Sequence, residues 1–393
     1  MTYMARLDLE GLGLDGGGDI LLRRALSRLK IGDALDVSGA HPELGLQLRA
    51  WARANGCACA PSPSDGSTRI VANTPRPATE RAGAAMLEGV VEQPPRAWGL
   101  AGRSAEVELG GPVFDFGLVD KHEVWTEDAA RFYARAAAAQ WDPNTAIDWD
   151  GVIAHDEEIE DAVVQVMTYL IENETAALIV PARFLARLHP HFREVMQILA
   201  IQAADEARHI EVFTRRALLR RDQLGLSTSG GQASLKTLID EPDFALASFL
   251  LSVMGEGTFL VLLDFLYRFG PDPVTRAVAR LAAQDEARHV AFGLSHLRRQ
   301  AQQEPALLNR LKGAVDRRHA ELAQTSGLNT RVFEALVVIA AGSFRVQDIA
   351  TGHDRVMQLQ ADMDRARQTS LVKLGFASAD AAALSKLHTR NFM

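Results

Sequence analysis

The stretch AADEARHIEVF, residues 203–213, places acids, an arginine and a histidine between apolar residues on a segment with the pattern of one helix. The same five letters, DEARH, return at residues 285–289 within AAQDEARHVAFG. In each copy a glutamate precedes a histidine by three positions, and residues three apart share one face of an α-helix. Each copy therefore directs a carboxylate and an imidazole toward one neighbour, as Glu206 with His209 and as Glu286 with His289.

The chain around the two copies is helical in pattern from Thr126 onward. After a shorter helix over 126–141, the apolar periodicity predicts long helices near 156–187, 191–222, 242–269 and 272–302. Gly, Pro and Asx residues with turn chemistry separate them. Three or four further helices are predicted over 305–390. The copies lie 80 residues apart with one long helix between them, as expected for the second and fourth helices of a bundle.

The third predicted helix carries an isolated acid. Glu256 is the only charged residue between Phe244 and Leu263. Burial of a lone carboxylate is costly unless the group is paired or bound to a metal. A metal site inside a bundle needs one such carboxylate from each helix that lacks a DEARH copy. We therefore expect Glu256 to be a metal ligand.

The first long helix offers two acids for the same role, Glu172 and Glu174. Glu174 shares its stripe with apolar residues, whereas Glu172 shares its face with polar ones, which favours Glu174. The spacing agrees, because Glu174 lies 32 residues before Glu206 and Glu256 lies 30 before Glu286. Four carboxylates and two imidazoles suit two borderline-hard ions such as Fe(II), with Mn as the other candidate. The predicted ligands are Glu174, Glu206, His209, Glu256, Glu286 and His289.

The order E…DExRH…E…DExRH over residues 155–300 resembles the ferritin-like, carboxylate-bridged di-iron oxidase superfamily. The resemblance implies a ferritin-like four-helix bundle, extended here by extra helices, with the six residues above as iron ligands. It also implies that Asp205 and Asp285 orient the imidazoles and that Arg208 and Arg288 pair with these acids. One position departs from the multicomponent hydroxylases of this superfamily, since Leu260 replaces the threonine four residues after the third-helix glutamate.

The resemblance further implies a non-haem di-iron oxidase or oxygenase with two Fe ions, or an Mn/Fe pair, and O2 as co-substrate. A small organic substrate, free or carrier-bound, would undergo hydroxylation, N-oxygenation, desaturation or oxidative cleavage. No nucleotide-binding fingerprint occurs, so an external electron donor such as a reductase is expected. The alternatives are a ferritin-like iron-handling or peroxide-scavenging protein and a sulfur-relay adaptor.

Residues 1–75 alternate between strand and helix patterns in the order β-α-β-α-β, which predicts a small α/β module. The segment GLGLDGGGDILLRRALSRLKIGDALDVSGAHPEL resembles the TusA-like sulfur-carrier family. In that family a Cys-Pro-x-Pro motif opens the first helix, whereas positions 16–19 here read GGGD. The cysteine is absent, so we expect the module to bind a partner, a second subunit or the substrate instead of moving sulfur.

Length and composition are consistent with this division. The 393 residues suffice for more than one domain, predicted as 1–75, a Pro-, Gly- and Ala-rich linker over 76–125, and a helical domain over 126–393. A net charge of −8 argues against a nucleic-acid partner. The N-terminus lacks the apolar core of a signal peptide, and no apolar run reaches the roughly 18–20 residues of a membrane span. With Cys57 and Cys59 as the only cysteines, we expect a cytoplasmic protein and no disulfide, with a homodimer as one option. The segment RRALLRRD, residues 215–222, is expected to be a solvated helix end.

Overall fold

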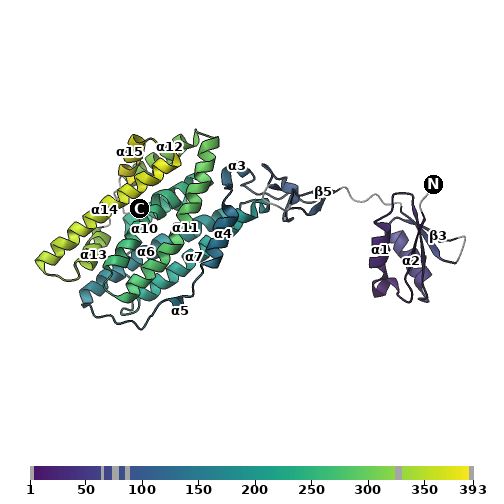
Figure 1. Cartoon of the computed structure of the whole chain (residues 1–393), viewed down its shortest axis with the longest axis horizontal. Coiled ribbons are helices and arrows are strands. Elements are labelled where there is room, and N and C mark those ends of the chain that lie inside the picture. Colours follow the sequence, from purple (N-terminus) through teal and green to yellow (C-terminus); the bar gives the residue numbers. More distant parts are fainter. Residues whose placement is uncertain (1–3, 63–65, 73–78, 85–88, 324–329, 389–393) are drawn as a thin grey trace. The chain divides into compact units, whose positions relative to one another are not determined.

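The computed structural model describes residues 4–62, 66–72, 79–84, 89–323 and 330–388 (Figure 1). The chain divides into two compact units, one of Met1–Glu80 with Glu106–Gly110 and one of Arg81–Ala105 with Gly111–Met393. The second unit is almost wholly helical, and the first holds a four-stranded sheet. The predicted fold class, mainly helical with a bundle of long helices, extra helices and a small N-terminal α/β unit, is confirmed.

The sheet of the first unit has the order β1-β2-β4-β3, with β1 and β2 parallel and the other pairs antiparallel. Leu22, Leu35, Leu48 and Ile70 are fully buried between the sheet and its helices. The strands are β1 (Met4–Asp8), β2 (Ala34–Ser38), β3 (Ala58–Pro61) and β4 (Thr68–Val71), and the helices are a π-turn η1 (Leu14–Gly18), α1 (Asp19–Leu26) and α2 (Leu44–Ala54). Sequence analysis missed β3, a short edge strand that ends at a proline and has no apolar alternation.

The described residues among 79–125 contain little regular structure, and all of them from Arg81 onward except Glu106–Gly110 belong to the second unit. Their elements are β5 (Thr79–Arg81) and β6 (Glu106–Glu108), which pair with each other, the 3-10 turn η3 (Arg96–Trp98) and α3 (Lys121–Val124). Within the predicted linker over 76–125, residues 76–78 and 85–88 lie outside the described residues.

The long helices form the centre of the second unit. They are α6 (Glu157–Leu185), α7 (Arg193–Ala217) and α11 (Pro273–Gln303), and a continuous helical stretch of α9 (Phe244–Ser248), the π-helical η5 (Phe249–Glu256) and α10 (Gly257–Phe269). Helix α6 packs along α7, α10 packs along α11, and α11 packs against α7 (Figure 1). The predicted ranges agree with these helices except that α7 ends at Ala217. A π-helical turn was not predicted. Such turns inside helices are frequent at functional sites, and this one ends at Glu256.

Shorter helices surround the long ones. They are α4 (Ala129–Ala138), α5 (Pro143–Ala146), the 3-10 turn η4 (Pro190–Phe192), α8 (Ser229–Ile239), α12 (Leu307–Leu322), α13 (Thr330–Ala341), α14 (Val346–Leu374) and α15 (Ser378–His388). Three or four helices were predicted after residue 305 and the described residues there contain four, whereas α8 was not predicted. The segment STSGGQ was interpreted as a turn, whereas Thr228 Oγ1 accepts a hydrogen bond from the Gly231 amide at 3.1 Å and so caps the start of α8.

Two stretches, Glu157–Leu185 and Phe244–Phe269, are long and apolar enough to cross a membrane by length and composition. Their most apolar windows are 67% and 72% buried inside the structure. Core helices of a bundle have the same properties, and both stretches carry predicted ligands.

The prediction of a solvated end at residues 215–222 is wrong for two residues, Arg216 and Ala217, which are fully buried. The Arg216 guanidinium donates to both carboxylate oxygens of Glu160, at 2.7 and 2.9 Å, and to Asp272 at 2.8 Å. Its Nε donates to the Thr275 hydroxyl at 2.8 Å. This buried ion cluster ties the end of α7 to the starts of α6 and α11.

Candidate metal centre

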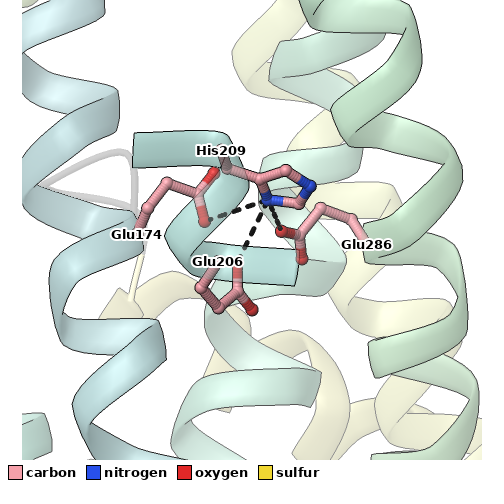
Figure 2. A group of neighbouring side chains, drawn as sticks. All are labelled: Glu174, Glu206, His209 and Glu286. Carbon is pink, nitrogen blue, oxygen red and sulfur yellow. Dashed lines mark hydrogen bonds and ion pairs between the residues drawn. The ribbon is translucent and has the colours of Figure 1, made fainter. Parts of the chain in front are cut away.

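The structure brings the six predicted ligands into one buried cluster, each with 4% or less of its surface exposed. They form two overlapping groups in which one donor atom from each residue lies within 4.8 Å of the others. Glu206 and Glu286 belong to both groups, and the remaining four residues divide between them. The groups are Glu174, Glu206, His209 and Glu286 (Figure 2), and Glu206, Glu256, Glu286 and His289.

His209 faces three carboxylates with one ring nitrogen (Figure 2). Its Nδ1 lies 3.1 Å from Glu206, 3.4 Å from Glu286 and 3.6 Å from Glu174. The opposite nitrogen, Nε2, lies 3.1 Å from Asp285 Oδ2 on α11. The side of the ring that meets the glutamates is therefore fixed by an aspartate of the other DEARH copy.

His289 repeats this geometry from α11. Its Nδ1 lies 3.0 Å from Glu206 and 3.5 Å from Glu286, and its Nε2 lies 3.2 Å from Asp205 Oδ2. The two copies are thus paired crosswise. An Nε2–H that donates to a carboxylate leaves the Nδ1 lone pair free to bind a metal. The resemblance implied that the two aspartates orient the imidazoles, and the contacts have the form which that role requires.

The two aspartates are held by four polar side chains. Arg208 Nη2 donates to Asp205 at 2.6 Å and to Asp285 at 2.8 Å, and Arg288 pairs with Asp285. Two donors were not predicted. Gln140 Nε2 donates to Asp205 and Trp141 Nε1 to Asp285, both at 2.8 Å.

The position of this second pair of donors depends on where α4 ends. The helix stops at Ala138, three residues before its predicted end, so Gln140 and Trp141 lie in the following loop. The Arg208 guanidinium also lies over the Trp141 ring, 4.6 Å from its centroid. The only local feature of the sequence that could have indicated these two donors is an amide and an indole side chain directly before a turn, in the segment QWDP.

Another residue missed by sequence analysis is Gln202. It is buried on α7, four positions before Glu206 and hence on the same face, and its Nε2 donates to Glu256 Oε1 at 2.9 Å. An uncharged residue on the apolar face of a DEARH helix is the signal that could have identified it. This bond fixes Oε1 of Glu256 and leaves Oε2 without a hydrogen-bond partner among the described residues.

The electrostatics of the cluster are those of crowded, buried acids. Burial and the carboxylates of Glu206 and Glu286 raise the pKa of Glu174 well above its usual range, and burial and Glu286 do the same to the pKa of Glu256. Burial also opposes ionisation of Glu206, but His289 and His209 outweigh it, so the pKa of Glu206 lies well below its usual range. Burial alone would lower the pKa of either imidazole, and the surrounding carboxylates raise both instead.

The donor atoms fit a pair of divalent ions. Glu174 Oε1, Glu256 Oε2 and both oxygens of Glu286 have no hydrogen-bond partner within the described part of the chain. Buried polar atoms almost always have one, so this many orphaned lone pairs in one place indicate a cation. Two divalent ions would balance the four carboxylate charges. Oxygen and imidazole donors without thiolate suit iron or manganese.

The two candidate acids of the first long helix can be separated by experiment. The structure places Glu174 in the cluster with 1% of its surface exposed, and Glu172 lies half-buried outside it. We expect Glu174→Ala to lower the iron bound per chain by half or more, because one group of donors loses a carboxylate. The matched control, Glu172→Ala, should retain the full iron content by mass spectrometry of the metal. The reverse ranking would show that α6 is rotated relative to the other helices.

No family model matches the chain, and no curated protein matches its sequence. Among solved structures, a Synechococcus protein with aldehyde deformylating oxidase activity is 16% identical, with a TM-score of 0.40 over 58% of this chain and 96% of that one. An R2-like ligand-binding oxidase with an aerobically reconstituted metal cofactor after photoconversion is 19% identical, with a TM-score of 0.43 over 66% and 94%. A variant of that oxidase with an Mn/Fe cofactor is 20% identical, with a TM-score of 0.44 over 66% and 94%. Likenesses this distant say nothing about the reaction of this chain.

Proposed function

We propose that this chain is a non-haem dimetal oxidase that uses O2 to oxidise a small organic molecule. The observation that carries the proposal is the pair of overlapping donor groups that share Glu206 and Glu286. Two Fe ions, or one Mn and one Fe, held there would supply the redox chemistry that O2 requires. An external electron donor completes the balance wherever the substrate does not provide all the electrons.

The residues around the centre hold the ligands and exclude water. The crosswise bonds from Nε2 of His209 and His289 to the aspartates keep each Nδ1 directed at the glutamates. Gln140, Trp141 and Arg208 in turn hold those aspartates, so the imidazoles cannot rotate freely. Such supporting contacts typically change metal affinity or activity about 10- to 100-fold when they are lost.

Apolar side chains surround the same centre. Met167, Leu170, Met254 and Leu262 are fully buried in the helices that carry the ligands. An apolar, water-poor surrounding strengthens electrostatic interactions inside a site and protects reactive species from side reactions. An oxidase needs such an apolar surrounding, whereas a protein that only stores iron does not need it.

For the N-terminal unit we propose a binding role and no sulfur transfer. Its helix start carries Gly16, Gly17 and Gly18 where a sulfur carrier has its cysteine. Burial raises the pKa of the Cys59 thiol, which lowers the fraction of reactive thiolate. Persulfide on Cys57 or Cys59 during turnover, with activity lost in the Cys→Ser variants, would overturn this proposal.

The metal content tests the oxidase proposal directly. We expect protein loaded with Fe(II) without air to bind two iron ions per chain and to consume O2 faster when a suitable organic substrate is present. Metal analysis and an oxygen electrode give the two readouts. One zinc ion per chain, or no metal after loading, would refute the dimetal centre. Equal O2 consumption with and without any organic molecule would favour iron handling.

A further inference from the structure

A cavity adjoins the metal centre between α6, α8, η5, α10, α11 and α12. It holds about 400 Å³ of space not filled by atoms, its open mouth included, and it reaches the ligands Glu174, Glu256 and Glu286. The walls are mostly apolar, formed by Ala177, Leu235, Leu238, Leu250, Leu251 and Phe259. Apart from the three ligands, the polar side chains in the wall are Asn173 and Arg318.

Arg318 is the unusual member of this wall. It is 6% exposed, and its Nη2 donates to the Ser234 hydroxyl at 2.8 Å, while its Nε has no partner in the described chain. No carboxylate of the described residues lies within 4.0 Å of its guanidinium, although buried arginines usually have such a partner. Burial lowers the pKa of Arg318 to about 10, so the side chain remains charged at neutral pH.

A second buried arginine, Arg367, shares a neighbour with Arg318, because both act on His388. Arg367 is 2% exposed, and it donates to the hydroxyls of Ser385, at 3.1 Å, and Thr258, at 3.2 Å, but forms no ion pair among the residues described.

His388 is affected by both arginines. Burial, Arg318 and Arg367 together hold the pKa of His388 well below its usual range. Glu321 acts on Arg318 and Asp364 acts on Arg367, but neither carboxylate forms an ion pair with its arginine among the described residues. A buried guanidinium without a close ion pair is costly, and an anion from outside would offset that cost at Arg318.

The polar atoms beside Arg318 also lack partners. The Tyr169 hydroxyl and Asn173 Oδ1 are buried and form no hydrogen bond within the described residues. Tyr169 lies close enough to Arg318 for the two groups to interact electrostatically. Of these groups Asn173 and the Arg318 guanidinium line the cavity, and a guanidinium nitrogen with a donor to spare matches a carboxylate oxygen better than it matches an apolar group.

We propose, on the basis of the proposed oxidase function, that Arg318 binds the carboxylate of the substrate. The substrate is then a small carboxylic acid whose apolar chain or ring lies along the leucine wall of the cavity. Its carboxylate lies at the Arg318 end, and a carbon remote from it approaches Glu174 and Glu256. One accessible guanidinium matches one negative charge, and the planar fork of arginine matches a carboxylate in two bonds.

The proposal predicts that binding depends on the acid and on Arg318. Octanoate and benzoate, each compared with its neutral amide, serve as probes in titration calorimetry of the anaerobic, iron-loaded protein. We expect each acid to bind at least about 10-fold more tightly than its amide, because hydrogen bonds between charged groups contribute that much. Arg318→Gln should weaken acid binding about 10- to 100-fold and leave the weaker amide binding unchanged.

The neighbouring arginine provides the matched control. The Arg317 side chain is 56% exposed and pairs with Glu241 at the surface, so Arg317→Gln should bind the acids as the parent protein does. Arg318→Lys keeps the charge but loses the fork, and we expect it to restore part of the acid preference. If Arg318→Gln does not fold, the preference for acid over amide and the Arg318→Lys variant decide the matter.

Several results would overturn the proposal. They are equal binding of acid and amide, no binding of either, and acid binding that survives Arg318→Gln. Acid binding that survives this substitution but disappears when the metal is removed would place the carboxylate on the metals. Iron content measured on the same samples separates the two proposals. Two irons without binding that depends on Arg318 refute only the carboxylate site, and no iron with such binding refutes only the dimetal centre.

Discussion

Glu206→Ala protein is expected to lose substrate oxidation more than about 100-fold, beyond the upper end of the loss caused by altering groups that only support metal ligands. Glu206 belongs to both donor groups and lies within 3.1 Å of both imidazoles. Its removal therefore weakens both ion positions at once. His289→Ala should have a similar effect on activity while it weakens mainly one position. Oxygen uptake with substrate and iron content per chain are the measurements.

A matched control lies on the same helix. Glu211 is exposed on α7, so Glu211→Ala should keep both activity and iron. The helical content of Glu206→Ala, by circular dichroism, should stay close to that of the parent protein, since the substitution leaves the packing of α7 along α6 and against α11 in place. Full turnover in either ligand variant would show that oxidation takes place elsewhere.

The second large effect concerns stability. Arg216→Met should destabilise the helical unit by about 3–5 kcal/mol, because it leaves Glu160 and Asp272 buried without their cation. The measurement is urea unfolding followed by circular dichroism, read on the transition of that unit. We expect the urea concentration at the midpoint of unfolding to decrease clearly. The six residues of the metal cluster should keep their positions, because they lie elsewhere on the same helices.

Arg220→Met is the control for this substitution. Arg220 pairs at 2.6 Å with Glu157, whose side chain is 64% exposed, and a surface pair of this kind contributes about 0–1 kcal/mol. A loss of less than 1 kcal/mol in Arg216→Met as well would mean that Glu160 and Asp272 take up protons or water at little cost. The buried cluster would then not hold α7 to α6 and α11.

The six residues of the cluster could be predicted because their signals are local and repeated. The three-residue spacing in each DEARH copy, the isolation of Glu256 and the apolar stripe of Glu174 are all visible within one or two helical turns. Helical periodicity then places these residues on inward faces. The sequence therefore predicts which side chains share a helix face. The structure shows that the donor atoms of these side chains lie close together.

The residues that could not be predicted depend on contacts distant in sequence. Arg216 is drawn into the core by Glu160 and Asp272, each 56 residues away, so its own segment gives the pattern of an exposed helix end. Trp141 reaches an aspartate 144 residues later. The π-helical turn before Glu256 likewise has no simple signature in an apolar run. Tertiary packing determines all of these features, and single-sequence patterns contain little of it.

The crosswise pairing of the two DEARH copies has a consequence for how this protein can change over generations. Asp205 serves His289, and Asp285 serves His209, so each copy completes the other. A substitution that shifts one copy disturbs the imidazole of the other, and neither can be replaced, moved or lost by itself. We therefore expect descendants and ancestors of this chain to alter the two copies together or not at all. A hybrid that takes α6–α7 from this chain and α9–α11 from a relative with an altered second copy should keep one intact motif and yet lack a working centre.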